Sequence, residues 1–294
     1  MKVMKFIGSN IVYIIWFLLY FTIAWAILGA NWTSFMIVSV IYGISVTIAL
    51  SPIGEGILRF TEGCRLPTTE EEYNYLMPLF EEVYDNAREL NPTLSSDIKL
   101  YITDDMYVNA FAMGRNTVAV TRGAMATLTA DELKGVLAHE LGHITHGHTK
   151  ALLLAVVGNF FFSIIVWIFR ILLNIVQFFA NLSANFNVVG IAFAVITFIT
   201  RVFADLSILL FVNLSQIILA INSRTNEIQA DTFAYEIGYG RELISAMYLL
   251  QKITMGQKVS LSDRLKASHP HIAYRIRQLE ILEDMGIITL QDMA

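Results

Sequence analysis

The six histidines of this chain lie in two short stretches, and the first stretch contains the spacing of a zinc site. His139, Glu140 and His143 form an HExxH pattern. On a helix, histidines at i and i+4 share one face, and Glu140 sits beside them. Two neutral imidazoles, a third protein ligand and a water complete a tetrahedral zinc site, in which the pKa of the water falls to about 7. The pattern is typical of a metal-dependent hydrolase, with Glu140 accepting the proton of the water.

The helix that carries this pattern has a clear start in the sequence. Thr129 and Glu132 have capping-box spacing, and apolar residues follow at helical spacing, namely Leu133, Val136, Leu137, Leu141 and Ile144. Because charged residues lie in its first turn, we expect the helix to begin outside a bilayer. The two histidines of the pattern already fill its ligating face, so we predict that His146 and His148 are surface residues.

Two apolar blocks interrupt an otherwise ordinary composition. The chain is 55% hydrophobic and 15% charged, whereas roughly a quarter of residues are charged in soluble domains. Residues 6–54 contain no charged residue, and residues 151–223 contain only Arg170, Arg201 and Asp205. This composition excludes a purely soluble enzyme and a disordered chain. Cys64, the only cysteine, excludes a disulfide-built scaffold, and the net charge of -5 argues against nucleic acid as the main partner.

Each apolar block is long enough for a helical hairpin, since a membrane span needs about 20 mostly apolar residues. The first block predicts spans at 11–28 and 35–50, although a cleaved signal peptide is an alternative for the first of these. The second block predicts spans at 151–169 and 206–221. At i, i+4 spacing, Arg201 and Asp205 are expected to neutralise each other.

Positive charges predict the orientation of these four spans. One side of the membrane carries most of the lysines and arginines that flank them, namely Lys2, Lys5, Arg59, Arg65, Lys150 and Arg224. The positive-inside rule places that side in the cytoplasm. We therefore expect a multi-pass protein of the cell's inner (plasma) membrane, with both termini and both charged regions in the cytoplasm.

Topology also narrows the search for the third metal ligand, which should be a carboxylate or histidine on the same side of the membrane. The chain crosses twice after His143 and re-emerges near Arg224, where Glu227 and Asp231 lie one helical turn apart. We predict Glu227 as the third ligand of one zinc ion (Zn2+) per chain, and Asp231 as a group that orients a ligating imidazole. We also expect both ligand helices to continue from the second hairpin.

The remaining charged segments predict an α+β fold, a mainly helical metalloprotease domain with a small sheet and two transmembrane hairpins. Capping-box spacing at 68–72 opens a helix to about residue 90; short strands follow at 97–103, 108–113 and 117–121, and later helices at 223–239, 241–255 and 268–285. The predicted domains are a first hairpin (1–54), a first catalytic part (55–150), a second hairpin (151–223) and a second, helical catalytic part (224–294).

Four motifs together resemble the HtpX family of membrane zinc endopeptidases, which are relatives of the CAAX prenyl endopeptidases. In chain order they are Asn109-Ala110-Phe111-Ala112, the HExxH pattern, Ser223-Arg224 with Glu227, Ala230 and Asp231, and His269-Pro270 with Arg275-Ile276. The resemblance covers most of the chain. One departure is that many members carry Asn and Asp at the positions of His146 and His148.

The resemblance implies the same third ligand as the topology and adds roles for further residues. It makes Glu227 the third ligand, the strand around Asn109 a substrate-docking edge, and His269 and Arg275 parts of the active site that stabilise an oxyanion. We therefore expect an endopeptidase that cleaves misfolded or damaged membrane proteins at the cytoplasmic face, in quality control and stress response, with polypeptides and the lipid bilayer as partners. The alternatives are a divalent-metal transporter and a non-catalytic zinc-binding membrane scaffold; a scaffold would not require Glu140.

Overall fold

The computed structural model describes residues 15, 17–26, 28–185, 188–254 and 272–286, with part of the side chains in the two longest helices. The chain divides into two compact units. The first contains Met1–Ile11, Thr47–Leu154 and Ala220–Ala294, and the second contains Val12–Val46 and Ala155–Leu219. The first unit thus unites segments that the second apolar block separates in the sequence.

The first unit contains a three-stranded sheet with the order β1-β3-β2. The strands are β1 (Lys99–Thr103), β2 (Ala110–Met113) and β3 (Thr117–Thr121), which confirms the three predicted strands with slightly narrower bounds. β3 runs parallel to β1 and antiparallel to β2, and its central place leaves every one of its residues buried. β2 is therefore an edge strand. Gly114, whose φ is 60°, opens the turn between β2 and β3.

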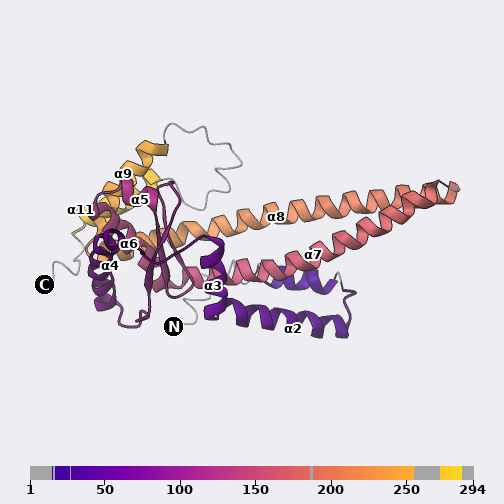
Figure 1. Ribbon diagram of the computed structural model, residues 1–294, viewed down its shortest axis with the longest axis horizontal. Coiled ribbons are helices and arrows are strands. Elements are labelled where there is room, and N and C mark those ends of the chain that lie inside the picture. The colour runs from indigo at the N-terminus through magenta and orange to yellow at the C-terminus, as the bar shows by residue number, and fades with distance from the viewer. Residues whose placement is uncertain (1–14, 16, 27, 186–187, 255–271, 287–294) are drawn as a thin grey trace. The chain divides into compact units, whose positions relative to one another are not determined.

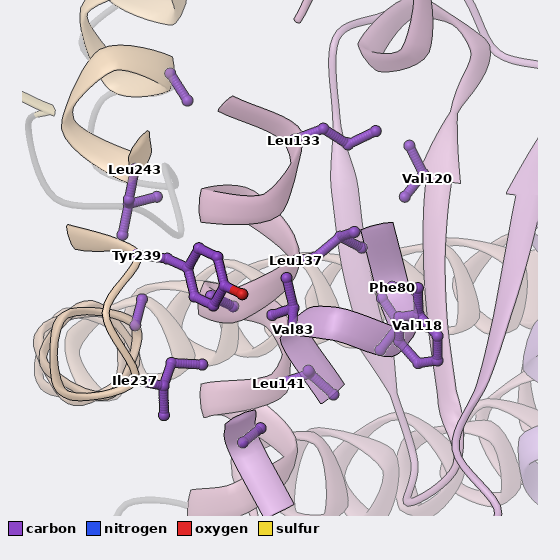
Figure 2. Packing of buried hydrophobic residues seen from close by; sticks show 14 of the residues in the cluster. Phe80, Val83, Val118, Val120, Leu133, Leu137, Leu141, Ile237, Tyr239 and Leu243 are labelled. Carbon is purple, nitrogen blue, oxygen red and sulfur yellow. The ribbon is translucent and has the colours of Figure 1, made fainter. Parts of the chain in front are cut away.

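Helices pack around this sheet, with α6 (Ala130–His146) in contact with β2, β3, α4 (Glu70–Leu90) and α9 (Gly240–Thr254). Further helices of this unit are α3 (Pro52–Thr61), α5 (Arg122–Thr127) and α11 (Ile272–Asp284). Capping boxes at Thr69 and Thr129 start α4 and α6, as the sequence predicts. Figure 2 shows Leu133, Leu137 and Leu141 of α6 among buried side chains of α4, β3 and the segment leading into α9. The HExxH helix is thus the centre of the core.

The second unit consists of helical hairpins. Helix Phe17–Ala26 packs against α2 (Trp32–Ala49) through Tyr20, Ala24, Val38 and Tyr42. The other hairpin is formed by the parts of α7 (His148–Ala184) and α8 (Val188–Glu236) that belong to this unit, and the two helices run antiparallel there (Figure 1). Three helical segments among the described residues are long and apolar enough to cross a membrane, namely Trp32–Ala49, Trp167–Ala184 and Val188–Leu206.

The second hairpin corrects two sequence predictions. Both helices continue beyond Arg170 and Arg201 to a turn near residue 185. The candidate spans found among the described residues of this hairpin are Trp167–Ala184 and Val188–Leu206, whereas the predicted spans were 151–169 and 206–221. Asp205 lies 2.5 Å from Arg170 Nη2 across the hairpin, but 3.9 Å from Arg201 Nε on its own helix. The closer partner of Asp205 is therefore Arg170, which antiparallel packing of the two helices brings near it. The i, i+4 spacing in the sequence does not reveal this pair. In the first block, residues 11–14, 16 and 27 of the predicted first span lie outside the described residues.

The two ligand-bearing helices differ in how they join the hairpin. α8 is continuous from Val188 to Glu236, so the predicted continuation is confirmed, and the predicted helix start at residue 223 is wrong. α6 instead ends at Gly147, whose φ is 75° and whose N–H donates to the carbonyl of Ile144. The left-handed glycine separates α6 from α7, so the predicted continuation of the histidine helix is wrong.

Candidate active site

The structure brings His139 and His143 of α6 together with Glu227 of α8. The two Nε2 atoms lie 3.2 Å apart, and each lies 3.4 Å from a carboxylate oxygen of Glu227. Glu227 is only 2% exposed and His139 is also buried. Among the described residues, these three form a group of potential metal ligands whose donor atoms all lie within 4.8 Å of one another.

The spacing of these donor atoms fits a tetrahedral metal ion. Zinc bonds of about 2.0 to 2.1 Å imply ligand atoms about 3.4 Å apart at tetrahedral angles. Here the two Nε2 atoms lie 3.2 Å apart, His139 Nε2 lies 3.4 Å from Glu227 Oε2, and His143 Nε2 lies 3.4 Å from Glu227 Oε1. Two imidazoles and one carboxylate are also a donor set of catalytic zinc sites that leaves a position for water. One donor atom from each of the three side chains lies within 4.8 Å of the other two, so the group suits a divalent ion such as zinc.

Asp231 and Arg275 contact His139 and Glu227 and hold these two side chains in place. Asp231 Oδ1 lies 2.8 Å from His139 Nδ1, so His139 donates its Nδ1–H and directs Nε2 toward His143 and Glu227. Arg275 of α11 donates from Nε and Nη2 to Asp231, at 2.8 and 2.6 Å. Its Nη1 lies 2.8 Å from Glu227 Oε2. One guanidinium thus joins the carboxylate that orients His139 to the predicted ligand carboxylate.

Opposing charges balance in this buried cluster. Burial and the nearby Arg275 both lower the pKa of His139, but Asp231 and Glu227 outweigh them and raise it to about 9. Burial raises the pKa of Asp231, yet hydrogen bonds and charge from Arg275 and His139 bring it below its usual value. Asp231 is therefore a carboxylate at neutral pH and can accept the proton of His139 in a hydrogen bond.

His148 contradicts the prediction of a surface residue. It is 4% exposed, and its Nε2 lies 2.9 Å from Gln229 Oε1 while its Nδ1 lies 3.1 Å from His143 Nδ1. Since the Gln229 oxygen can only accept, His148 donates from Nε2 and accepts at Nδ1, which assigns the donated proton to His143 Nδ1. Burial and the charge of His143 lower the pKa of His148 to about 3, which keeps its ring neutral.

The hydrogen bond from His143 Nδ1 to His148 leaves Nε2 of His143 available to a metal. In the same way, the hydrogen bond from His139 Nδ1 to Asp231 leaves Nε2 of His139 available. The signal in the sequence is Gly147: a glycine permits the φ of 75° that ends α6, so His148 begins α7 and does not continue the face of α6. His146, by contrast, is exposed, which confirms the surface prediction for that residue.

A close contact between α6 and α8 brings the histidines and the carboxylate together. A Cβ atom added at Gly142 would lie 2.9 Å from Ala230 Cα and 3.0 Å from its carbonyl oxygen, which is too close for any larger residue. Gly142 precedes His143, and Ala230 lies one turn after Glu227. Glycine at position 142 therefore permits the backbones of α6 and α8 to approach closely beside the ligand group.

The structure describes all but one of the remaining predicted site residues. Glu140 is buried on α6 beside His139. Ala110, Phe111 and Ala112 lie half-buried on β2, against which α6 packs, and Asn109 is exposed just before it. His269 lies outside the described residues.

Comparison with known proteins agrees with this geometry. Residues 75–283 match the sequence model of Peptidase family M48. The chain belongs to peptidase family M48. It is thus a metalloprotease, and the predicted resemblance to HtpX proteases is confirmed by the relatives that follow.

This M48 peptidase is similar to several bacterial HtpX proteins along most of their length. It is 26% identical over 285 residues to Protease HtpX of Shewanella loihica, covering 89% of this chain and 94% of that one. It is 26% identical over 274 residues to Protease HtpX of Pseudomonas putida, covering 85% and 86%. A Protease HtpX homolog of Methylacidiphilum infernorum is 29% identical over 230 residues, covering 70% and 72%.

One solved structure to which the chain is similar is the crystal structure of S. mikatae Ste24p, with a TM-score of 0.47 and 20% sequence identity. The match covers 95% of this chain and 65% of that chain, so this peptidase spans less than two thirds of Ste24p.

Proposed function

We propose that this M48 peptidase is a zinc-dependent endopeptidase that cleaves misfolded or damaged membrane proteins at the cytoplasmic face of the inner membrane. Four spans hold it there, in two hairpins at about 1–54 and 151–223, with both termini in the cytoplasm. The two catalytic parts, 55–150 and 224–294, join in one unit. Its role is in membrane protein quality control and the stress response, and its family membership disfavours a transporter or a scaffold.

The observation that supports the zinc site is the convergence of His139 and His143 on Glu227: their Nε2 atoms lie 3.2 Å apart, and each lies 3.4 Å from a different oxygen of the Glu227 carboxylate. Asp231 and His148 each contact the Nδ1 atom of one of these histidines, so the Nε2 atoms of both histidines are left on the side of Glu227. One zinc ion per chain is held by His139, His143 and Glu227. When bound, it supplies Lewis acidity toward the scissile carbonyl and lowers the pKa of the attacking water.

Glu140 is the general base of the proposed reaction. It follows His139 on a helix that is buried at this point, and it belongs to the motif without joining the ligand group. Its carboxylate takes the proton of the attacking water and then delivers it to the leaving nitrogen of the peptide. Burial keeps bulk water from competing for that proton.

Arg275 acts as a positioning residue in this proposal. All three of its guanidinium nitrogens lie near the carboxylates of Asp231 and Glu227. It keeps both carboxylates ionised and in place. Stabilisation of an oxyanion by Arg275 or His269, as the resemblance implies, stays a prediction.

The edge strand β2 is the proposed docking site for an extended substrate. Asn109 accepts from the backbone N–H of Thr121, and Ala110, Phe111 and Ala112 follow in antiparallel register with β3. Because backbone groups alternate in direction along a strand, the N–H and C=O groups of Ala110 and Ala112 point away from β3. Pairing through these groups recognises backbone with little side-chain selectivity, which suits unfolded substrates.

Edge pairing is tested at Ala112. Ala112→Pro removes the outward N–H, and we expect it to raise KM for an unfolded protein substrate. Ala112→Gly keeps the N–H and is the matched control. Equal KM values in the two variants would count against pairing at this edge.

The zinc endopeptidase is tested with Glu140→Gln in the full-length protein. We expect this variant to retain one zinc per chain in elemental analysis and to lose about 10²- to 10⁴-fold in cleavage of an unfolded substrate. His139→Ala and Glu227→Ala should lose both zinc and cleavage. Zinc loss in Glu140→Gln, or cleavage at the wild-type rate, would contradict the roles assigned here.

A further inference from the structure

Helix α3 exposes an apolar face that no described part of its unit covers. Ile53, Ile57 and Phe60 are 66%, 55% and 88% exposed. Their spacing of i, i+4 and i+7 places them on one side of the helix. Gly54 and Glu55 on the other sides are buried. In water, three large apolar side chains on one face of a ten-residue helix are unfavourable, which indicates a different surrounding.

The start of α3 is packed against the end of α2, one of the candidate membrane spans. α2 ends at Ala49, and Ser51 caps α3, accepting from the N–H of Ile53 and donating to the carbonyl of Ile48. A Cβ atom added at Gly54 would lie 2.5 Å from the carbonyl oxygen of Ile48. The bend between the two helices is therefore tightly packed, and α3 begins at the point where the span ends.

The opposite face of α3 is bound to the sheet. Glu55, only 6% exposed, accepts from the N–H groups of Arg115 and Asn116 at 3.2 and 3.1 Å, and from the hydroxyl of Thr117. Arg59 donates to the same hydroxyl at 2.9 Å. α3 is thus hydrogen-bonded to the turn between β2 and β3. These contacts determine which side of α3 faces the sheet and which side carries the exposed apolar residues.

We propose that α3 lies in the membrane interface, with Ile53, Ile57 and Phe60 inserted among the lipids. The occupant of the apolar face is the bilayer, because the face begins at Ile53, only four residues along the chain from Ala49, where an apolar candidate span ends. A cavity of about 510 Å³ beside α3 is lined by the basic side chains of Arg59, Lys99 and Arg115 and by the acidic side chains of Glu55 and Asp97. Three positive and two negative groups leave one net positive charge, which is compatible with anionic lipid headgroups. The inference rests on α2 as a span and does not depend on the proposed peptide hydrolysis.

Glu55 binds α3 to the turn between β2 and β3, so the position of α3 also affects β2. A helix lying in the interface and bonded to that turn sets the height of β2 above the lipid surface. The proposed docking edge is then kept close to segments of substrate that have just left the bilayer.

Site-directed spin labelling of the full-length protein tests this inference. A nitroxide is attached at Phe60→Cys in a Cys64→Ser background, and the protein is reconstituted in nanodiscs of phosphatidylcholine and phosphatidylglycerol. Accessibility to oxygen, which enters lipid, is compared with accessibility to a water-soluble nickel chelate. We expect the label at residue 60 to be accessible to oxygen and protected from nickel, and a label at Ile57→Cys to give the same result.

Three control labels make the result specific. Val40→Cys on α2 should be protected from nickel more strongly, as expected in a span. Tyr107→Cys, exposed in the loop at the other end of β2, should be fully accessible to nickel, and Glu62→Cys should exceed Phe60→Cys in nickel accessibility. If residues 57 and 60 match residue 107 while residue 40 stays protected, α3 does not lie in lipid. Nickel access at residue 40 would also overturn the inference, because α2 would not be a span.

Discussion

The two helices that carry the predicted metal ligands reach the site by different means. α6 has 17 residues, a capping box at its start and a left-handed glycine at its end. α8 has 49 residues and passes through position 227 without a cap or a break. Local bonds determine where α6 begins and ends, whereas the portion of α8 that carries Glu227 has no local start. Its carboxylate therefore depends on contacts with other elements.

Those contacts are few and specific. Ala230 of α8 packs on Gly142 of α6, and Arg275 of α11 holds Glu227 and Asp231. The difference teaches that the histidine pair is a property of one helix, while the complete ligand group is a property of the packed unit. The following variants test this comparison, from the largest expected effect to the smallest.

Arg275→Met should produce the largest loss of stability. It removes the cation from two buried carboxylates while preserving much of the side-chain volume, and uncompensated buried charge costs about 3 to 5 kcal/mol. The free energy of unfolding, measured by denaturant in detergent with metal chelated, checks this value. Arg277→Met, at an exposed position of the same helix, is the control. Equal stability of the two variants would show that Arg275 does not hold the carboxylates.

Gly142→Ala should separate α8 from α6. The added methyl group would meet Ala230 Cα at 2.9 Å, and a displacement of about 1 Å in a catalytic group can cost about 10²-fold in rate. We expect cleavage and zinc affinity to fall together. Gly56→Ala, where the nearest atom to the new Cβ is a side-chain nitrogen at 3.7 Å, should leave both unchanged. Normal zinc affinity in Gly142→Ala would refute the role of this contact.

His148→Ala should weaken zinc binding by about 10- to 100-fold, the usual effect of losing a partner that orients a ligating histidine. His143 then keeps its Nε2 but loses the acceptor for its Nδ1–H. The dissociation constant for zinc, measured by competition with a chelator, reports this change. His146→Ala is the control, because His146 also packs on His148 but its Nδ1 bonds to the carbonyl of Gly142 instead of to His143. An equal dissociation constant for zinc in both variants would show that His148 does not orient His143 for metal binding.

Glu132→Gln should have the smallest effect, because it changes only the start of α6. Burial raises the pKa of Glu132, but hydrogen bonds from Thr129 and Ser245 have the larger effect and bring the pKa below its usual value of 4.5. The carboxylate therefore contributes stability above pH 4.5, and this contribution is lost as pH falls below that value. We expect a loss of less than about 1 kcal/mol at pH 7, which disappears in acid.

The pH dependence of unfolding, measured from pH 7 to pH 3, checks this prediction. Asp131→Asn changes the neighbouring, exposed carboxylate of the same turn and is the control. A difference between Glu132→Gln and wild type that stays constant down to pH 3 would show that the charge of Glu132 does not stabilise the cap.

Local patterns were sufficient for much of this protein. The capping box at Thr129, the three strands, the HExxH pair and the two apolar blocks were all predictable, because each depends on residues within a few positions of one another. Glu227 was predictable as a ligand candidate because a count of membrane crossings limits where the chain can return. The start of α8 was not, since no residue near 223 interrupts a helix that packing extends in both directions.

The partners of buried polar side chains were decided only by the tertiary structure. His148 was expected at the surface and instead bonds to His143 and Gln229, and Asp205 bonds most closely to Arg170 on another helix. Hydrogen bonds and ion pairs depend on distances of a few ångströms between elements far apart in the chain, and periodicity carries no information about those distances. The sequence by itself determined which residues can do the chemistry; the packing of α8 and α11 against α6 decided how they are held.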